Sequence, residues 1–486
     1  MSLVLVIAIP ILGAFLLPML SHRSAVLGRL FGPIIIAVNL GLALSIWQHV
    51  TLNGPQVEWI GGFAAPLGIV FHVDQFTAIL LLAIAVMTIL LWPRRMEDPI
   101  REPVLSLVLM GAASGLALSS DLFNLFVFYE LTAVASYGLV ASRATGPSQI
   151  AAIRFLILSA AGSALALLGI ALIYSITGSL NLAYLAQVAP TLLSGPLGMS
   201  AFMLILIGFG VKAELFPVNT WVPEVYASAS SRVSAMLSGV VSKLAMVVIL
   251  KVLITVYANT SASLVMLVVG LLTLVSGELA AYRAKDFRRM LAFSSIAQLG
   301  MVAMAFSVSG TAGLLAGFAI MLHHLLAKPA LFLLAERWGG HLDRLTGAAY
   351  SSKTGAILFL FLALSLIGVP PLPGFWAKYL LLTALFGHDQ SLYYFAAAVL
   401  LITTVIEAAY LMRILQRLYQ HKNSTLEPHR ASELVPALVL GGTLFLSVLV
   451  AAPLGAALSG IARSSADIPA YIQRVLPVDV PKEINV

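Results

Sequence analysis

The chain has 486 residues, of which 60% are hydrophobic and only 10% are Asp, Glu, Lys or Arg. Because a soluble domain carries about a quarter of its residues as these four types, this composition excludes a water-soluble fold and indicates an integral membrane protein. The net charge is +7, and the chain has no cysteine, which excludes disulfides, thiolate zinc sites and cysteine-ligated iron–sulfur clusters within it.

A helix needs about 20 mostly apolar residues to cross a bilayer, and about fourteen segments meet this requirement. The first has neither the basic start nor the cleavage site of a signal peptide, so we interpret it as a retained helix. We therefore expect an all-α integral membrane protein. The predicted spans are residues 2–20, 27–47, 73–93, 103–119, 122–142, 148–176, 196–222, 230–254, 261–282, 288–308, 313–335, 354–386, 391–412 and 434–460.

Two segments outside these spans are less apolar than the spans themselves. Residues 49–72 contain six glycines and prolines between short β-prone runs, which predicts an outer hairpin or loop. Residues 461–486 are polar and include proline, so they predict a polar tail. The expected organisation is thus a single polytopic membrane domain over residues 1–460, followed by this tail.

The cations predict the orientation of the chain. With the amino terminus outside, 18 of the 27 Lys and Arg residues fall in inner loops, three fall in the tail, and the outer loops between spans hold none. Positive residues keep a loop on the cytoplasmic side, so this distribution supports both the orientation and the number of spans. The remaining six cations lie within spans: Arg154, Lys212, Lys243, Lys251, Lys328 and Lys378.

Charges within a bilayer cost roughly 2.5–3.5 kcal/mol each on insertion scales, so they indicate function by default. Glu130 lies near the middle of its span and needs a cation or a proton, either as part of a proton path or as a permanently paired structural carboxyl. Glu278 and Glu407 lie within about two turns of predicted inner ends, where half-solvated structural pairs are common. Glu214 lies at a probable helix break.

Two spans are predicted to be broken beside a lysine. Pro217 ends the helix that carries Lys212, and Pro370, Pro371, Pro373 and Gly374 interrupt the span that leads to Lys378. Broken helices with charged residues near the middle of the membrane are typical of ion sites in transporters. Their occurrence in both halves of the chain predicts an internal repeat, with interfacial snorkelling as the alternative for each lysine.

The other intramembrane cations differ in their surroundings. Lys243 is deep in its span and can act as a proton carrier, whereas Lys251 is predicted to snorkel at the outer end and Arg154 lies towards the inner side. His324 and Lys328 are spaced i, i+4 on one helix face, which suits a proton relay, while His323 points about 100° away. One adjacent histidine pair does not supply axial ligands from facing helices, which argues against a b-type haem.

Five motifs occur in order along the chain: Asp121-Leu-Phe-Asn-Leu-Phe-Val-Phe-Tyr-Glu130, Lys212-Ala-Glu-Leu-Phe-Pro217, Leu237-Ser-Gly-Val-Val-Ser-Lys243, Arg288-Arg-Met-Leu-Ala-Phe-Ser-Ser-Ile-Ala-Gln298-Leu-Gly300 and Gly368-Val-Pro-Pro-Leu-Pro-Gly374-Phe-Trp-Ala-Lys378. These motifs resemble those of the antiporter-like subunits of respiratory complex I, of energy-converting hydrogenases and of Mrp-type sodium/proton antiporters. The resemblance covers nearly the whole chain, and the Lys-Ala-x-x-Phe-Pro form is most similar to the Mrp D subunit or its hydrogenase counterpart.

This resemblance implies 14 helices with two inverted five-helix repeats, helices 4–8 over about 103–254 and helices 9–13 over about 261–420, in which helices 7 and 12 are the broken ones. It also implies a set of residues for proton translocation, with Glu130 and Lys212 as an ion pair and Lys378 at the exit. Glu214, Glu278 and Glu407 have no counterpart in the family motifs. The implied translocation residues are Glu130, Lys212, Lys243, His324, Lys328 and Lys378.

The expected function is proton translocation by one subunit of a multisubunit membrane complex, most simply a Mrp-type Na⁺/H⁺ antiporter in a prokaryotic cytoplasmic membrane. The alternative is a proton-pumping subunit of a hydrogenase or of a complex I-like NADH:quinone oxidoreductase. We expect no cofactor, metal or redox chemistry within the chain and no nucleic acid partner. The expected partners are homologous antiporter-like subunits, small membrane subunits, the bilayer, H⁺ and Na⁺.

Three other classes compete with this reading. An oxidoreductase subunit with its own quinone or metal site is disfavoured by the missing cysteines and axial histidines. A stand-alone transporter or lipid flippase would keep its flux without neighbouring subunits. A structural scaffold has no use for six cations within its spans. The sequence leaves open whether a cation gradient, hydrogenase chemistry or quinone reduction drives the complex.

Overall fold

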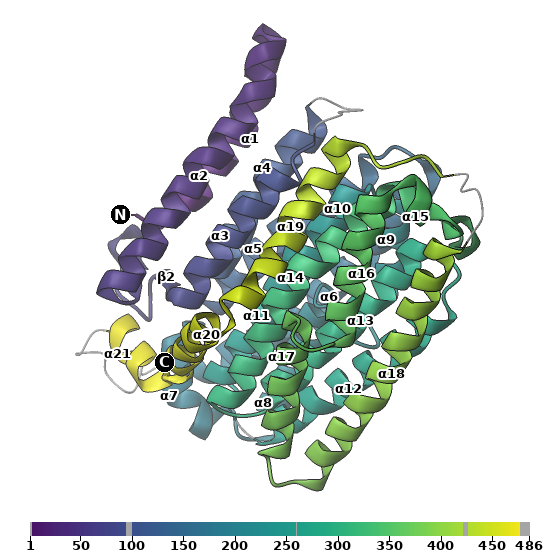
Figure 1. The fold of residues 1–486 in the computed structure, drawn as a ribbon. Coiled ribbons are helices and arrows are strands. Elements are labelled where there is room, and N and C mark those ends of the chain that lie inside the picture. Colours follow the sequence, from purple (N-terminus) through teal and green to yellow (C-terminus); the bar gives the residue numbers. More distant parts are fainter. Residues whose placement is uncertain (1, 94–99, 259, 421–425, 477–486) are drawn as a thin grey trace. The chain divides into compact units, whose positions relative to one another are not determined.

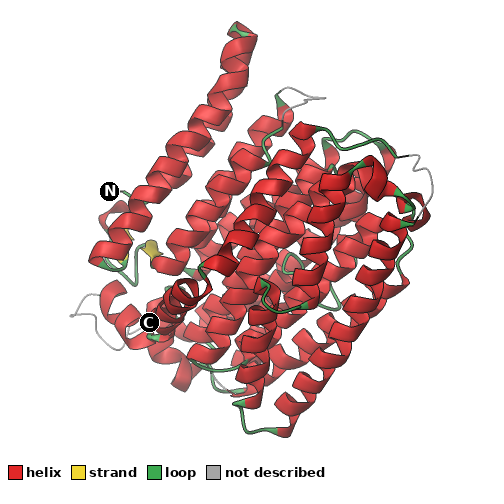
Figure 2. Cartoon of the chain, viewed as in Figure 1, coloured by secondary structure: helices red, strands yellow, loops and turns green. Residues whose placement is uncertain are grey.

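The structure is a computed structural model, and it describes residues 2–93, 100–258, 260–420 and 426–476. Helices make up most of the described residues, as Figure 2 shows. The chain divides into two compact units. The first consists of residues 1–213, 244–262 and 463–486, and the second of residues 214–243 and 263–462. The expectation of an all-helical membrane protein is confirmed, and the two short strands among the described residues form a single hairpin.

The first unit holds the amino-terminal helices, coloured purple to blue in Figure 1. Its neighbours in sequence pack against each other, so that α1 lies beside α2 and α5 beside α6. Its elements are α1 Leu5–Arg23, α2 Ala25–Asn53, β1 Gln56–Trp59, η1 Ile60–Gly62, β2 Val70–Val73, α3 Gln75–Leu90, α4 Arg101–Leu118, α5 Leu122–Ala141, α6 Gly146–Thr177, α7 Leu182–Leu192, α8 Pro196–Gly210 and α21 Ile468–Val475.

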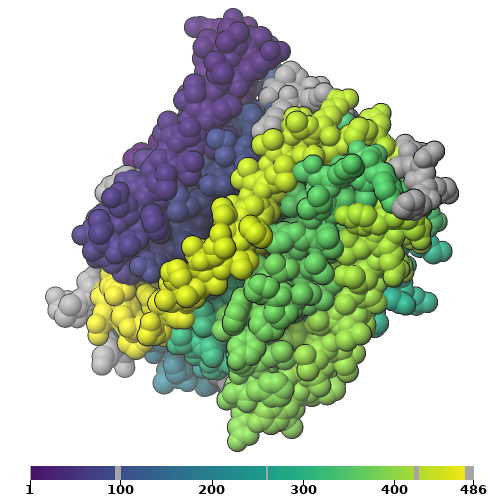
Figure 3. Space-filling model, in the orientation of Figure 1, coloured from purple at the N-terminus to yellow at the C-terminus, as the bar shows by residue number. Residues whose placement is uncertain are grey.

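The second unit holds most of the remaining helices. In the space-filling view, α16, α17 and α18 (green) lie side by side on one face of this unit, as their mutual contacts require (Figure 3). α11 Ser242–Thr255, α12 Thr260–Arg283 and α20 Ala451–Ala466 have residues in both units. The other elements are α9 Val222–Ser228, α10 Ser231–Met236, η2 Leu237–Val241, α13 Phe287–Ser307, α14 Thr311–Trp338, η3 Leu342–Leu345, α15 Ala348–Ser351, α16 Lys353–Ile367, α17 Pro373–Phe386, α18 Ser391–Tyr419 and α19 Ala431–Leu449.

Eleven helices among the described residues are long and apolar enough to cross a membrane. Three of the predicted spans instead correspond to the shorter α3 and to the pairs α8–α9 and α16–α17, which are separated by breaks. The prediction of fourteen spans, of the inverted repeats and of the orientation therefore stays a prediction. Four cations used in the orientation count, Arg94, Arg95, Lys422 and Lys482, lie outside the described residues.

Both predicted breaks are present, but the first begins earlier than the proline. α8 ends at Gly210, so Lys212 lies in the irregular segment and not in the middle of a helix. Glycine is a poor helix former, and Gly208 and Gly210 precede the lysine, so the last turn has little intrinsic stability. The second break separates α16 from α17, and Gly368 has a positive φ of 90° where α16 ends.

Of the hairpin or loop predicted over residues 49–72, a hairpin is present from Gln56 to Val73, whereas residues 49–53 belong to α2, and the described part of the tail is helical, which its composition did not indicate. β1 pairs antiparallel with β2, in a register that places Gln56 opposite Val73. In the tail, α20 continues to Ala466 and α21 follows it. Val475 and Leu476 pack into an apolar cluster with Val70 and Tyr184, which explains why α21 is held against the hairpin. Residues 477–486 lie outside the described part.

His72 of β2 lies within this region. Its ring lies edge-on to the Tyr471 ring of α21, with 5.1 Å between centroids, and its Nε2 is buried without a hydrogen-bond partner among the described residues. Burial lowers the pKa of His72 to about 4, a shift that Asp74 opposes and that Lys251 and Arg474 reinforce. The folded protein therefore holds this imidazole neutral at a pH where an unfolded histidine is already protonated.

This shift predicts a stability that depends on pH. An unfolded histidine titrates near pH 6.5, so the contribution of His72 is complete above that pH and is lost progressively as the pH falls towards about 4. We expect the thermal unfolding midpoint to fall over this range, and His72→Gln to make the fall shallower. Circular dichroism melting curves of the purified wild type and variant between pH 7 and pH 4 measure this. Parallel curves would contradict the assignment.

Candidate functional site

Lys212 and Glu130 form an ion pair in the first unit. The Lys212 Nζ lies 3.3 Å from Glu130 Oε1, and it also donates to the carbonyl oxygen of Tyr129 at 3.2 Å. The same ammonium lies 3.2 Å from the centroid of the Tyr129 ring, a cation–π contact. Ser163 of α6 donates a hydrogen bond to Glu130 Oε1. The side chain of Lys212 is 1% exposed and that of Glu130 is 32% exposed, so the lysine depends on this carboxylate.

Close packing of α6 and α8 positions Lys212. A Cβ atom at Gly208 would lie 2.5 Å from the carbonyl oxygen of Gly162, so two glycines let the backbones approach where no side chain fits. The hydroxyl of Tyr129 donates to the carbonyl oxygens of Gly208 and Phe209, both at 3.2 Å. The last turn of α8 is thereby tied to α5, which carries Glu130. Lys212, which follows α8, meets Glu130 of α5 because the end of α8 is packed against α6 on one side and hydrogen-bonded to α5 on the other.

Glu214 lies in the irregular segment after α8 and is the first residue of the second unit. Its φ is +60°, a left-handed conformation that costs a residue with a Cβ of order 1–3 kcal/mol. The hydroxyl of Tyr226 donates to Glu214 Oε1 at 2.5 Å, and the side chain of Glu214 is fully buried. The electrostatic partner of the carboxyl is Lys243. Glu214 is thus a buried acid whose charge interacts with that of Lys243.

Lys243 follows a local widening of its helix. Residues Leu237–Val241 form a turn of π-helix, which leaves carbonyl groups outside the usual i to i+4 pattern. The Lys243 Nζ donates to the carbonyl oxygen of Ser238 in this turn and to Ser242 Oγ at 3.3 Å. Such turns are frequent at functional sites, and here the turn supplies the lysine with an acceptor inside the membrane span.

His324 and Lys328 lie one turn apart on α14, and both are fully buried. The Lys328 Nζ donates to Ser294 Oγ of α13 at 2.5 Å. Both ring nitrogens of His324 lack a hydrogen-bond partner among the described residues. His323 faces elsewhere, and its Nε2 lies 2.9 Å from Ser365 Oγ of α16. The structure agrees with the sequence in separating the two histidines.

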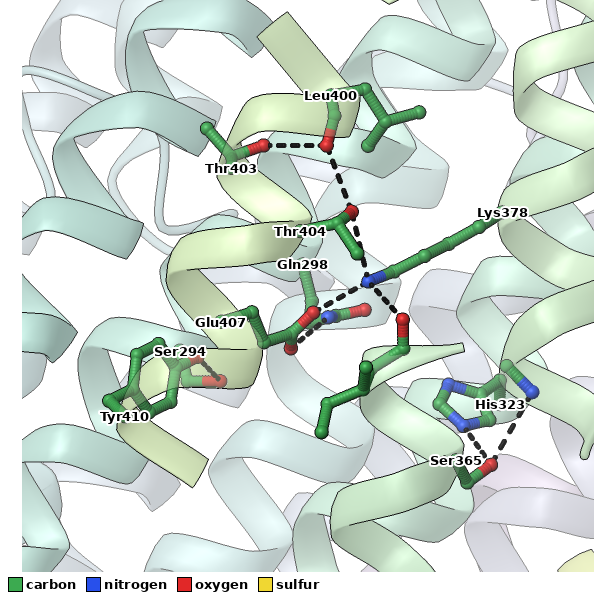
Figure 4. A network of polar contacts seen from close by, with 12 residues as sticks. Ser294, Gln298, His323, Ser365, Lys378, Leu400, Thr403, Thr404, Glu407 and Tyr410 are labelled. Carbon is green, nitrogen blue, oxygen red and sulfur yellow. Dashed lines mark hydrogen bonds and ion pairs between the residues drawn. The ribbon is translucent and has the colours of Figure 1, made fainter. Parts of the chain in front are cut away.

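Lys378 lies in α17, just after the second break, and Figure 4 shows its surroundings. Its Nζ lies 2.6 Å from Glu407 Oε2 of α18 and donates to Thr404 Oγ1 at 3.3 Å. It also donates to the carbonyl oxygen of Ile367 at 3.3 Å. Ile367 is the last residue of α16, where the helix dipole favours a cation. Gln298 of α13 donates to the other carboxylate oxygen of Glu407 at 3.0 Å.

Two expectations about the acids are therefore wrong. Glu278 and Glu407 are not half-solvated, because each is only 1% exposed. Glu407 is also not near a helix end, since α18 continues to Tyr419, seven residues beyond the predicted limit of 412. Arg413 and Arg417 in this extension lowered the apparent hydropathy and shortened the prediction. The sequence had no motif to indicate that Glu407 pairs with Lys378.

The two remaining cations lie outside these sites. Lys251 does not snorkel, because its Nζ donates to the carbonyl oxygens of Ala117 and Ser119 at 2.6 and 2.9 Å, where it caps the end of α4. Arg154 has an exposed side chain on α6. Of the six predicted intramembrane cations, four therefore remain as buried lysines with acidic neighbours.

These four lysines are matched by four acids among the described residues. Glu130 forms an ion pair with Lys212 and Glu407 with Lys378, whereas Glu214 is an electrostatic neighbour of Lys243, and Glu407, Glu278 and Glu214 are the acidic neighbours of Lys328. A buried charge is tolerated where an opposite charge and hydrogen bonds offset its desolvation, and each of the two ion pairs can release a proton when its members separate. No group of three or more His, Asp or Glu side chains within the described residues is placed to hold a metal ion.

Comparison with known proteins gives consistent matches over most of the chain. The family described as NADH:quinone oxidoreductase/Mrp antiporter, TM matches residues 119–406. The chain is 30% identical over 439 residues, 85% of each chain, to the D subunit of the Na(+)/H(+) antiporter of Alkalihalophilus pseudofirmus. Among solved structures, a chain of an archaeal membrane-bound sulfane sulfur reductase matches with 29% identity, covers 98% and 99% of the two chains and has a TM-score of 0.91. A chain of the Mrp complex from Dietzia sp. matches with 27% identity, the same coverage and a TM-score of 0.88.

The exposure difference within the first pair predicts an asymmetric effect of mutation. Glu130→Gln leaves an ammonium that is 1% exposed without its counter-ion, whereas Lys212→Met leaves a carboxylate that is 32% exposed. We expect Glu130→Gln to lower the stability of the protein more than Lys212→Met, and the double variant to recover most of the loss. Thermal inactivation of purified protein measures this, with Lys353→Gln at an exposed position as a control. Additive losses in the double variant would contradict the pairing.

Proposed function

Because this chain belongs to the NADH:quinone oxidoreductase/Mrp antiporter family of transmembrane subunits, we propose that it translocates protons as one subunit of a larger membrane complex. The proposal rests chiefly on one observation, the buried pair of Lys212 and Glu130 at the interrupted end of α8. A helix that ends within the membrane leaves backbone groups for ions and permits local movement, which a continuous helix does not.

The pair provides a means to move a proton. While Glu130 lies 3.3 Å from the Lys212 Nζ, its negative charge stabilises the protonated lysine. If the carboxylate moves away, desolvation favours the neutral amine, and the proton leaves for the next acceptor. The ordered transfer of protons then requires an external drive, since moving one charge across 100 mV costs about 2.3 kcal/mol.

For the driving reaction, we propose exchange of monovalent cations for protons in a Mrp-type complex. The similarity to the D subunit of an antiporter over 85% of both chains supports this reading. A second reading is a proton-pumping subunit of a redox-driven complex. It is favoured by the fit to a chain of the sulfane sulfur reductase, which is described as an archaeal respiratory membrane complex.

The same comparisons support proposals on partners and location. Chains of similar fold come from multisubunit membrane complexes, and we propose that this chain contacts homologous antiporter-like subunits and small membrane subunits. We place it in a prokaryotic cytoplasmic membrane with its amino terminus outside, on the basis of the positive residues in alternate loops. H⁺ is the transported ion in this chain, and Na⁺ passes through the same complex.

Transport by the assembled complex tests this proposal. In vesicles that contain the complex, we expect a Na⁺ pulse to drive proton movement, which a pH-sensitive dye reports. Lys212→Ala and Glu130→Gln should reduce the rate by roughly tenfold or more, because a proton carrier or its counter-ion is lost. Lys353→Gln, which alters an exposed lysine, is the matched control.

The same vesicles distinguish the two readings. Proton movement that follows the Na⁺ pulse without any electron donor supports the antiporter reading, whereas movement only during electron transfer supports the redox-driven one. Wild-type rates in both Lys212→Ala and Glu130→Gln would show that this chain does not carry the protons.

A further inference from the structure

A groove opens on the surface of the first unit, beside the ends of α1 and α5 and the start of α4. It has a volume of about 640 Å³, and sites that hold small molecules have volumes of roughly 300–1,000 Å³. α1 and α5 each pack against α4, so the groove lies where these three helices meet. Its lining includes Pro18 of α1, Arg101 and Leu105 of α4, and Val134 and Tyr137 of α5.

The lining of this groove is apolar except at one end. Leu105 and Val134 contribute aliphatic side chains, and Tyr137 contributes an aromatic ring. Arg101, the first residue of α4, is exposed and is the one Lys or Arg among the described lining residues. A groove that is mostly apolar and cationic at one end suits an amphiphile with a negative headgroup, because the apolar and the charged parts of such a ligand both find a partner.

Further positive charge lies close to Arg101. Arg23 is the last residue of α1 and lies five residues beyond the lining residue Pro18, and Arg143 follows the end of α5. The loop that carries Arg143 is held at the start of α4, because Ser142 Oγ donates to Glu102 Oε1 at 2.8 Å. Glu102, the acid next to Arg101, therefore already accepts a hydrogen bond from the chain itself. The described residues around this end of the groove thus favour an anion.

The length of the groove favours a lipid over a helix of another subunit. The lining residues span 100–105 at the start of α4 and 134–138 on α5, which is roughly 6–8 Å along a helix at 1.5 Å per residue. A helix that crosses the bilayer runs along about 30 Å of its neighbour and needs a longer apolar surface. A lipid needs contact only for its headgroup and the adjoining part of one acyl chain.

We propose that this groove binds an anionic phospholipid of the bilayer, with its phosphate at Arg101 and part of an acyl chain between α1 and α5. The guanidinium group of arginine holds a phosphate through paired N–H donors, which a lysine cannot do. On the predicted orientation the groove opens towards the cytoplasmic leaflet, where basic pockets between helices bind lipid headgroups. This site goes beyond the proposed function, because it does not depend on which ion the chain moves.

Photo-crosslinking of the full-length chain tests this site. The chain is reconstituted in phosphatidylcholine vesicles that carry a trace of phosphatidylglycerol with a photoreactive acyl chain, or of the same probe made from phosphatidylcholine. We expect the phosphatidylglycerol probe to label residues 100–105 and 134–138 severalfold more than the phosphatidylcholine probe does. Arg101→Gln should reduce this labelling roughly fivefold, the effect of one basic residue at an anionic surface, and Arg101→Lys should retain most of it.

A second variant tests the groove itself. Val134→Trp places a large ring in the groove and should abolish the labelling, whereas Ile157→Trp on α6 should leave it unaltered. Both positions are exposed, at 49% and 61%, so neither change disturbs the core, and thermal unfolding of each variant verifies this.

Three results would overturn the proposal. The first is equal labelling by the two probes, and the second is labelling of wild-type extent in both Arg101→Gln and Val134→Trp. The third is loss of the labelled peptides when the chain is in its assembled complex, because a partner subunit would then occupy the groove in place of a lipid.

Discussion

The need to neutralise charge within the membrane governs this structure. Two buried lysines form direct ion pairs, Lys212 with Glu130 and Lys378 with Glu407. A lysine or an acid without a partner would be expensive to bury. Three lysines and three acids are buried among the described residues of the second unit, and the separation of acid and lysine is the step that the proposed proton translocation requires.

The interruptions in the helices also help to stabilise the buried lysines, because they leave backbone carbonyl groups without a partner within the helix. Lys378 uses the carbonyl oxygen of Ile367 at the end of α16, and Lys243 uses that of Ser238 in a turn of π-helix. A regular helix offers no such acceptors, because its carbonyl groups are already paired. The break after α16 and the turn of π-helix before Lys243 thus supply hydrogen-bond acceptors to the two lysines. This link between backbone irregularity and buried charge explains why both features coincide in the sequence.

Sequence patterns predicted the helical membrane fold and the hairpin, because apolar length and proline position act locally, whereas the contact of Lys212 with Glu130 was implied by the resemblance to the family. They could not predict the partner of Lys378, since the pairing with Glu407 depends on how α17 packs against α18. Hydropathy also placed Glu407 near a helix end, because the charged residues that continue α18 resemble a loop. For Lys251 the error was of the same kind, as its acceptors at the end of α4 are distant in sequence.

The central claim is that the buried acid–lysine pairs themselves carry the transported charge. Charge displacement across a membrane that contains the assembled complex, recorded after a rapid jump in Na⁺ or addition of an electron donor, tests this most directly. The account predicts a displacement in the wild type that is reduced both in Glu130→Gln and in Glu407→Gln, one variant for each ion pair. A displacement of wild-type size in both variants would contradict it, because the charge would then cross by a path that avoids these residues.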